Sequence, residues 1–327
     1  MPTKKLKTVT ICALTIILTL LTQIANAQAL KVTVTTNKQT YNLGEEIQIS
    51  GNLTLGGNPV TDGQVAIQIV NTKGDTLALR VIPTGAEVLP PYMIEILEIY
   101  SCDKQGNPVS TFQPGTFAYF HITVRNNDQV ERNATITLNF YDSTNTPFDC
   151  TYISQTLWPQ TNLTFTLPEL IPSEIPSGAA SVYANAFSAF PSEGGRAFCP
   201  EKTAQFIISS GTLGGTAPPT YIEGQYALTF NMPRKDVVVG TYTVYVAAYY
   251  IGDYSTANAT FQTILVGDIN HDGKVDMKDI GITVKAFGST PQTPNWNPNA
   301  DVNKDNKIDM KDIGIVVSDF GKTCIYP

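Results

Sequence analysis

The residues with the clearest chemistry lie in the last part of the 327-residue chain, where one twelve-residue pattern rich in Asp and Asn occurs twice. The copies are residues 268–279 and 301–312, so the second begins thirty-three residues after the first. In both copies an Asp or Asn stands at positions 1, 3, 5, 9 and 12. A loop with this spacing can surround Ca²⁺ with oxygen ligands at roughly 2.3–2.6 Å. We therefore predict two calcium loops and two bound ions.

The predicted ligands are five side chains in each copy and the backbone carbonyl of the lysine at position 7. They are Asp268, Asn270, Asp272, Lys274, Asp276 and Asp279 in the first copy, and Asp301, Asn303, Asp305, Lys307, Asp309 and Asp312 in the second. Position 6 must turn the chain with a positive φ, and it is Gly273 in one copy and Asn306 in the other. After Gly, Asn enters the left-handed region most readily. The alternative is a pair of acidic surface turns.

Apolar residues follow each loop at the spacing of one helix face. They are Ile280, Val284 and Phe287 after the first loop, and Ile313, Val317 and Phe320 after the second. The i, i+4, i+7 spacing predicts a helix, and a glycine just beyond each run is typical of a helix end. No helix is expected before either loop, because residues 261–266 have a strand pattern and residues 291–298 contain prolines.

This duplicated loop with a single following helix, and with Asp at position 12, resembles the dockerin family of cellulosome-type and related surface proteins. The resemblance covers about residues 265–322. It implies a small α-helical calcium module at residues 267–322 that binds a cohesin-type domain of another protein. In that family, loop positions 10 and 11 and the exposed helix face contact the partner; positions 10 and 11 correspond here to Met277, Lys278, Met310 and Lys311. Family members often have small hydroxyl residues there, so the choice of partner stays open.

The first residues have the pattern of a secretory signal. Three lysines precede an apolar run at about residues 9–21, and small residues occupy positions 25–27. We predict a signal peptide at residues 1–27 and a secreted, cell-surface-associated protein that begins near Gln28. No later apolar run approaches the ~20 residues of a membrane span. An uncleaved anchor is the alternative.

Charge and the small number of histidines limit the possible functions. The net charge of −7 argues against a nucleic-acid partner. The two histidines are His121 on a predicted wet strand face and His271 in a calcium loop, so no Ser or Cys nucleophile has a credible base. Pairs of acids such as Glu169 and Glu174 are interpreted as surface charge. We therefore predict a protein that is not an enzyme.

The cysteines predict disulfide bonds. One of the five lies in the predicted signal, which leaves Cys102, Cys150, Cys199 and Cys324. An even number in an oxidising compartment favours disulfides, with three possible pairings. Zinc is the alternative, but no Cys-x-x-Cys spacing or nearby histidine supports it.

Residues 31–266 alternate polar and apolar side chains in short runs, which predicts a mainly β fold of antiparallel strands. Residues 89–210 have about six or seven strands, enough for one immunoglobulin-like sandwich. They resemble cell-adhesion-related domains of prokaryotic surface proteins. Residues 28–88 and 222–266 resemble the opening and the close of a macroglobulin-type or bacterial immunoglobulin-like domain.

We therefore predict two β-sandwiches, one inserted in the other, with a linker at residues 211–221 and a tail at residues 323–327. In this arrangement Val65, Ile67 and Ile69 share a core with Tyr242, Val244 and Val246. The alternative is three domains in series.

Four Asn-x-Thr triplets lie in predicted strands, at Asn52, Asn133, Asn162 and Asn258. Because residues i and i+2 of a strand share a face, each Asn and its Thr point together, and the middle residue points inward. The asparagines then face solvent, where glycans can be attached. The alternative is that sheets rich in Thr and Asn form such triplets through composition alone.

Two classes of function remain. One is a non-catalytic surface or adhesion protein that docks through its C-terminal module. The other is a carbohydrate-binding subunit of a polysaccharide-degrading assembly, with aromatics such as Trp158, Tyr249, Tyr250 and Tyr254 stacking on sugar rings. Strands are rich in tyrosine in any case, so an exposed planar row of Trp or Tyr would be needed to favour the second class.

Overall fold

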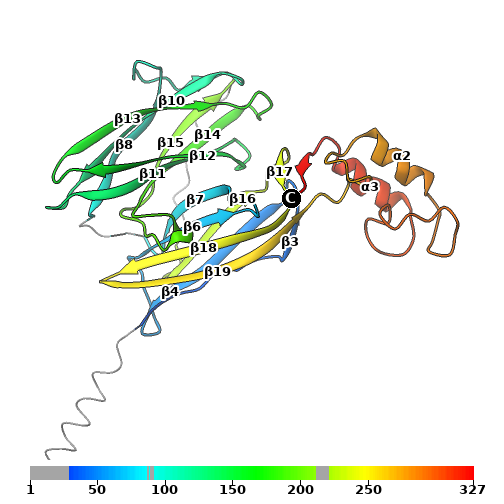
Figure 1. The fold of residues 1–327 in the computed structure, drawn as a ribbon, viewed down its shortest axis with the longest axis horizontal. Helices are drawn as coiled ribbons and strands as arrows, with labels where there is room; N and C mark the ends of the chain where they lie inside the picture. Colours follow the sequence, from blue (N-terminus) through cyan, green and yellow to red (C-terminus); the bar gives the residue numbers. More distant parts are fainter. Residues whose placement is uncertain (1–28, 87, 89–91, 211–220) are drawn as a thin grey trace, which may run out of the picture.

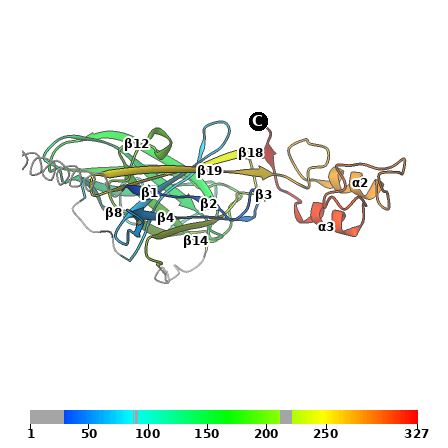
Figure 2. The same ribbon diagram turned by 90° about the horizontal axis from the view of Figure 1, so that it is seen from below.

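The structure is a computed structural model that describes residues 29–86, 88, 92–210 and 221–327. The predicted signal peptide and almost all of the predicted linker lie outside these residues. The described chain is mainly β with two short α-helices, as predicted. Figure 1 shows two β-units side by side and a helical module at one end. In the turned view of Figure 2 the module again extends away from the β-units. No described helix is long and apolar enough to cross a membrane.

Strands from both ends of the β region form the first unit, which we call the split β-unit (residues 30–83 and 225–264). One sheet contains β1 (Leu30–Val32), β2 (Thr35–Thr36), β4 (Glu46–Leu55), β5 (Asn58–Pro59) and β16 (Gln225–Asn231). The other has the order β3 (Thr40–Asn42), β19 (Asp253–Ile264), β18 (Gly240–Tyr250), β6 (Gln64–Val70) and β7 (Thr76–Pro83). Both sheets contribute to one cluster of buried side chains.

The pairing of β6 with β18 joins segments that are far apart in the sequence. Val244 lies opposite Ile69, and Val246 lies opposite Ile67. These residues, with Val65 and Tyr242, belong to the same buried cluster. The strand pairing therefore places residues 65–69 beside residues 242–246. That the two segments fold as one domain stays a prediction.

The second unit, which we call the central β-unit, comprises residues 94–208. One sheet has the order β13 (Asn162–Leu170), β10 (Phe117–Asn126) and β8 (Ile94–Cys102). The other has the order β12 (Pro147–Leu157), β11 (Arg132–Tyr141), β14 (Gly178–Phe187), β15 (Lys202–Ile208) and β9 (Thr111–Phe112). The alternate apolar residues of β10, β11 and β15 point into a core where the Phe120 ring lies 4.9 Å from Phe140 and 5.2 Å from Phe206. Such tilted contacts are the arrangement that aromatic rings prefer.

The two β-units meet at β7, the edge strand of its sheet. The Leu79 N–H donates to Asn139 Oδ1 at 2.7 Å, and the Leu79 carbonyl accepts from Asn185 Nδ2 at 3.2 Å. The Val81 N–H donates to Glu201 Oε2 at 3.2 Å. An open edge exposes unpaired backbone groups that can recruit another strand. Here side chains of the central β-unit satisfy three of those groups.

Glu201 also holds a buried arginine at this junction. Its carboxylate accepts from Arg80 Nε at 2.8 Å and from Arg80 Nη2 at 2.7 Å, and both side chains are about nine-tenths buried. The guanidinium carbon lies 3.3 Å from the centroid of the Tyr183 ring. Burial opposes the charge on Arg80, but the adjacent Glu201 carboxylate outweighs burial and raises the pKa of the guanidinium. Arg80 therefore keeps its charge beside Glu201, and the salt bridge joins the two units.

The predicted disulfides are not formed. Cys102, Cys150, Cys199 and Cys324 are free thiols in the described chain. Cys199 packs into the core of the central β-unit, whereas Cys324 packs into the cluster of the split β-unit, so these two lie in separate cores. Burial raises the pKa of Cys150 and of Cys199 to about 12. These groups are therefore neutral thiols at ordinary pH, a form that reacts slowly.

Removal of the junction carboxylate is expected to destabilise the protein. Glu201→Ala leaves Arg80 buried without a counter-charge and the Val81 N–H without its acceptor. Breaking a buried ion pair costs about 3–5 kcal/mol, which urea unfolding of the full chain would measure. Glu193→Ala, at an exposed site in the same unit, is the control and should change little. Equal stability of the two variants would contradict this role of Glu201.

The split β-unit is expected to depend on its second segment. A chain truncated after residue 210 lacks β16, β18 and β19, so β4 and β6 lose strand partners that lie beyond the cut. Residues 30–83 should then lose amide protection in hydrogen exchange, whereas residues 94–208 keep it because their sheets are complete. Undiminished protection of residues 30–83 would show that they fold alone.

Candidate functional site: a duplicated loop and helix

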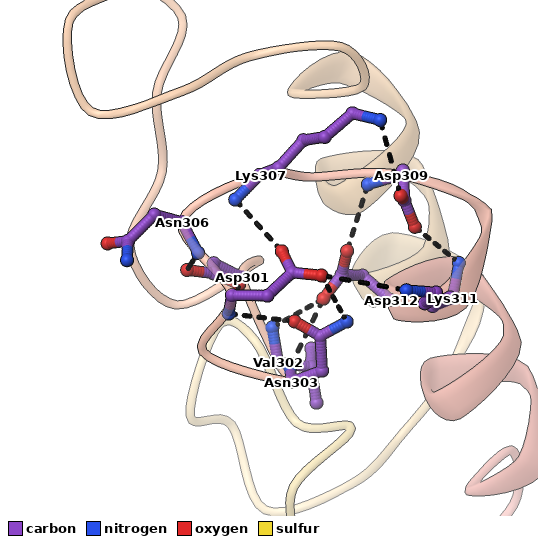
Figure 3. Close-up of polar contacts among 9 residues, drawn as sticks. Asp301, Val302, Asn303, Asn306, Lys307, Asp309, Lys311 and Asp312 are labelled. Atoms are coloured by element: carbon purple, nitrogen blue, oxygen red, sulfur yellow. Dashed lines mark hydrogen bonds and ion pairs between the residues drawn. The ribbon is translucent and has the colours of Figure 1, made fainter.

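The two predicted calcium loops fold with the same hydrogen bonds. In the first, the Asp268 carboxylate accepts from the N–H groups of Asp272 at 3.1 Å and Gly273 at 2.9 Å. In the second, Asp301 accepts from Asp305 at 3.1 Å and Asn306 at 3.0 Å. Each loop therefore closes around the carboxylate at position 1, as Figure 3 shows for the second copy.

The turns have the predicted backbone conformation. Gly273 has φ +89° and Asn306 has φ +65°, so both residues at position 6 are left-handed. The structure adds a second left-handed residue in each loop, because His271 and Lys304 at position 4 have φ values of +58° and +59°. Sequence reasoning missed these, since neither residue type is a strong signal for positive φ.

Each loop leads directly into a helix through a capping Asp. Asp276 and Asp309 are the N-caps of α2 (Met277–Lys285) and α3 (Met310–Ser318). Asp276 accepts from the Lys278 N–H at 2.7 Å, and Asp309 accepts from the Lys311 N–H at 2.8 Å. These backbone hydrogen bonds are the main cause of the lowered pKa of both caps. The two predicted helices are present.

The carboxylate at position 12 ties the start of each loop to its helix. Asp279 accepts from the N–H groups of Ile269 at 2.9 Å and Asp276 at 2.8 Å. Asp312 accepts from those of Val302 and Asp309, both at 2.9 Å. The two copies therefore share these hydrogen bonds, at nearly the same lengths, as well as the sequence pattern.

The predicted ligands fit a hard divalent cation in chemistry and burial. The carboxylates at positions 1 and 12 are almost inaccessible, at 2% for Asp268, 4% for Asp301 and 0% for Asp279 and Asp312. Buried carboxylates need a counter-charge as well as hydrogen bonds. The side chains offer only oxygen and no sulfur or imidazole, which is the donor set that Ca²⁺ takes.

Lysines pair with the remaining predicted ligand carboxylates, at positions 5 and 9. Lys274 Nζ lies 3.1 Å from Asp276, and the equivalent Lys307 lies 3.4 Å from Asp309. Lys278 and Lys311 lie 3.7 Å and 3.9 Å from the Asp at position 5 of their loops. Among the described residues, no group of three or more His, Cys, Asp or Glu side chains is arranged to hold a metal ion. Ion binding would therefore require these carboxylates to exchange their lysine partners for the cation, and the ligand set stays a prediction.

The predicted apolar stripes are only partly covered, because Ile280 and Ile313 are half-buried whereas the later residues of each stripe are exposed. In α2, Met277 is 68% and Val284 is 51% exposed, and Phe287, just after the helix, is 48% exposed. The matching values are 66% for Met310 and 49% for Val317 in α3, and 53% for Phe320 just after it. The buried positions are instead Asp279 and Thr283 in α2, and Asp312 and Val316 in α3.

The four predicted partner-binding residues are exposed as well. Met277 and Met310 begin the two helices, and the side chains of Lys278 and Lys311 are 67% and 74% exposed. We call the whole set the docking face, and it consists of Met277, Lys278, Val284, Phe287, Met310, Lys311, Val317 and Phe320. Exposed apolar patches rimmed by polar residues mark interaction sites in soluble proteins.

The predicted glycosylation sites have the expected exposure. Asn52, Asn133, Asn162 and Asn258 are all exposed. Of the middle residues of the triplets, Leu53 and Ala134 are buried, whereas the other two are half-buried. Glycan attachment stays a prediction.

The aromatic residues considered for sugar binding do not all lie on one face, since Tyr249 and Tyr254 are cross-strand partners in the split β-unit and Trp158 lies in the other unit. Trp158 is 65% exposed just after β12 in the central β-unit, whereas Tyr254 is 43% exposed on β19 in the split β-unit. The ring of Tyr249 is covered by the Arg196 guanidinium at 3.6 Å.

One acid of the pair Glu169 and Glu174 is not on the surface, contrary to expectation. Glu169 is 4% exposed, and burial together with the nearby Asp149 raises its pKa to about 9, so its interpretation as surface charge is wrong.

Comparison with known proteins identifies the C-terminal part of the chain. Residues 266–320 match the family model of the dockerin type I domain. The predicted resemblance is therefore confirmed for this segment, whereas the immunoglobulin-like resemblances are not confirmed. No curated protein matches the chain.

Solved structures give only distant similarities. Alkylpurine DNA glycosylase AlkC of Pseudomonas fluorescens is 9% identical with a TM-score of 0.28, over 36% of this chain and 31% of that one. The C-terminal domain of wzt is 7% identical with a TM-score of 0.31, over 38% and 78%. A β-glucosidase of Listeria innocua is 10% identical with a TM-score of 0.27, over 38% and 16%. This chain therefore spans less than a third of the glycosylase and of the glucosidase, and such low scores carry no functional argument.

Proposed function

We propose that the protein attaches itself through residues 267–322 to a cohesin-type domain of another protein, and that calcium is required for this attachment. The observation that carries the proposal is the docking face, which presents the same exposed side chains twice in a segment that matches the dockerin type I model.

The composition of the docking face suits a protein partner. Methionine is flexible and polarisable, so it can adapt to an apolar surface. Lys278 and Lys311 supply positive charge at the rim of a module that otherwise carries many carboxylates. Because both copies present Met and Lys at positions 10 and 11, either copy can contact the partner, in two orientations related by about a half turn.

Calcium has a structural role in this proposal. Each loop would hold one ion through the oxygen ligands at positions 1, 3, 5, 7, 9 and 12. The ion supplies the positive charge that the crowded carboxylates need, while Asp276 and Asp309 keep the helices capped. Because the loops also fix where α2 and α3 begin, ion binding and the folding of the docking face are linked.

For the rest of the chain we propose a non-catalytic role in a secreted, cell-surface-associated protein. The two β-units present four exposed Asn-x-Thr asparagines, which are sites for glycans. An alternative is a carbohydrate-binding subunit of a polysaccharide-degrading assembly, and the exposed indole of Trp158 is the observation that favours it. If the wild type binds a glycan array and Trp158→Ala does not, the carbohydrate-binding alternative is supported. If the wild type binds no glycan on the array, that alternative is rejected.

Calcium removal is expected to unfold the helical module alone. In the full chain, a chelator should abolish amide protection in residues 267–322, because four carboxylates in each loop lose their counter-charge. Protection of the β-units should persist, since the strand pairs of their sheets include no residue of the module, although module residues such as Ile269 and Val316 pack into the cluster of the split β-unit. The variant with Asp268→Ala and Asp301→Ala should behave in calcium as the wild type does in chelator. Calcium-independent protection of the module would contradict this role.

The docking face is expected to work as two interchangeable halves. Met277→Asp with Met310→Asp places a charge in both halves and should weaken capture of cohesin domains by tenfold or more, since one buried contact is worth about 1.4 kcal/mol or more. Each single variant should bind almost normally through the unchanged half. Ile251→Asp, at a turn that is 77% exposed on the split β-unit, is the control. Undiminished capture by the double variant in a binding assay against a cohesin panel would refute the assignment.

A further inference from the structure

The last residues of the chain are attached to the split β-unit. Strand β20 (Cys324–Ile325) pairs in parallel with β17 (Val237–Val238). The Thr323 N–H donates to the Arg234 carbonyl at 2.9 Å, and the Asp236 N–H donates to Thr323 Oγ1 at 2.9 Å. The tail is therefore bound to residues 234–238 in a separate two-stranded sheet beside the two sheets of the split β-unit.

The same tail lies on the first calcium loop. The Cys324 N–H donates to the Gly273 carbonyl at 2.8 Å. The Tyr326 hydroxyl donates to Asp268 Oδ2 at 2.8 Å, the same oxygen that accepts from the Gly273 N–H. The carboxylate at position 1 thus receives a hydrogen bond from a residue 58 positions away, outside its own loop.

The second loop has a different environment. Its carboxylate, Asp301, receives hydrogen bonds from Asp305 and Asn306, and within the described chain no tail residue donates to it. The two copies also differ at position 6. A Cβ atom at Gly273 would lie 3.0 Å from the Cys324 carbonyl oxygen, which is tighter than ordinary contact. The tail therefore explains why the first loop has glycine where the second has the exposed Asn306.

A second contact fixes the module on the same side. Asn42 Nδ2 of the split β-unit lies 2.9 Å and 2.8 Å from the two carboxylate oxygens of Asp319. Asp319 is 1% exposed and also accepts from the Gly267 N–H at 3.1 Å. Asp319 is the C-cap of α3, so the split β-unit contacts the module both at the first loop, through the tail, and at the end of the second helix, beside Gly267.

We propose that Tyr326 is a positioning residue for the cation of the first loop, and that the tail couples ion binding in that loop to the attachment of the module. This proposal rests on the proposed calcium binding. Hydrogen bonds from outside the ligand set orient a ligating carboxylate, and their loss typically lowers metal affinity about 10–100-fold. The first loop therefore binds calcium more tightly than the second. By linkage, calcium in the first loop strengthens the contact between tail and split β-unit.

The two loops can be followed separately in the full chain. The backbone N–H groups of Gly273 and Asn306 each donate to the position 1 carboxylate of their own loop, so their NMR signals report the two sites during a calcium titration. We expect Tyr326→Phe to weaken binding at Gly273 about tenfold or more and to leave Asn306 unchanged. The control Tyr152→Phe, which is 57% exposed on β12, should change neither signal.

A second variant tests the coupling without altering the loop. Thr323→Val keeps the side-chain shape but removes the hydroxyl that accepts from Asp236, so it loosens the tail while Tyr326 and Asp268 remain. It should weaken binding at Gly273 alone. In the wild type, calcium should also increase the hydrogen-exchange protection of the Val239 N–H, which donates to the Ile325 carbonyl at 3.1 Å.

Three results would overturn the proposal. Equal calcium affinities at the two loops, unaffected by Tyr326→Phe, would show that the tail positions nothing. A normal response to Thr323→Val, with Val239 protection independent of calcium, would remove the coupling. If neither Gly273 nor Asn306 responded to calcium, the calcium assignment would fail as well. Loss of cohesin capture with a normal titration would concern the docking face only.

Discussion

The constraint on which the structure depends is that buried backbone N–H groups must find acceptors where no helix or strand provides them. In both loops and at the junction of the β-units, side-chain carboxylate oxygens accept from these N–H groups. Asp268 and Asp301 close the loops, Asp279 and Asp312 join loop to helix, and Glu201 caps the edge of β7. In the two loops the carboxylates that accept these hydrogen bonds are also the groups proposed to bind calcium, whereas Glu201 pairs with Arg80.

The sequence predicts what short-range periodicity determines. The twelve-residue spacing located both loops and their left-handed turns, and the alternation of apolar residues located the strands of the central β-unit. The pairing of β6 with β18 could also be anticipated, since neither apolar strand had enough neighbours close in sequence to cover it. The loops and strands are indicated by patterns a few residues long. The pairing of β6 with β18 is indicated because each strand has too few neighbouring strands nearby in the sequence.

The remaining features depend on contacts between distant residues that leave no local pattern. Glu201 and Arg80 are 121 positions apart, and Tyr326 is 58 positions from Asp268. Glu169 resembles any surface acid in the sequence, yet the fold buries it beside Asp149. The free cysteines show the same limit, because an even count gives no information on which core holds each thiol. The sequence does contain one feature related to the tail contact. Position 6 is Gly273 in the first loop, where the Cys324 carbonyl approaches closely, and Asn306 in the second.

The two helices show that an apolar periodicity predicts a helix without showing whether its apolar face is buried or exposed. Apolar residues spaced i, i+4, i+7 predict a helix, but they do not say whether that face is covered by the same chain. In α2 the covered face contains Asp279 and Thr283, while Met277 and Val284 face solvent, as does Phe287 just beyond the helix. Burying a carboxylate and exposing these apolar side chains is unfavourable for the chain alone, and it fits the proposal that a partner covers them. Tyr326 donates to Asp268 in the first loop, whereas within the described residues Asp301 accepts only from N–H groups of its own loop, so the two copies present the same exposed residues from loops with different surroundings.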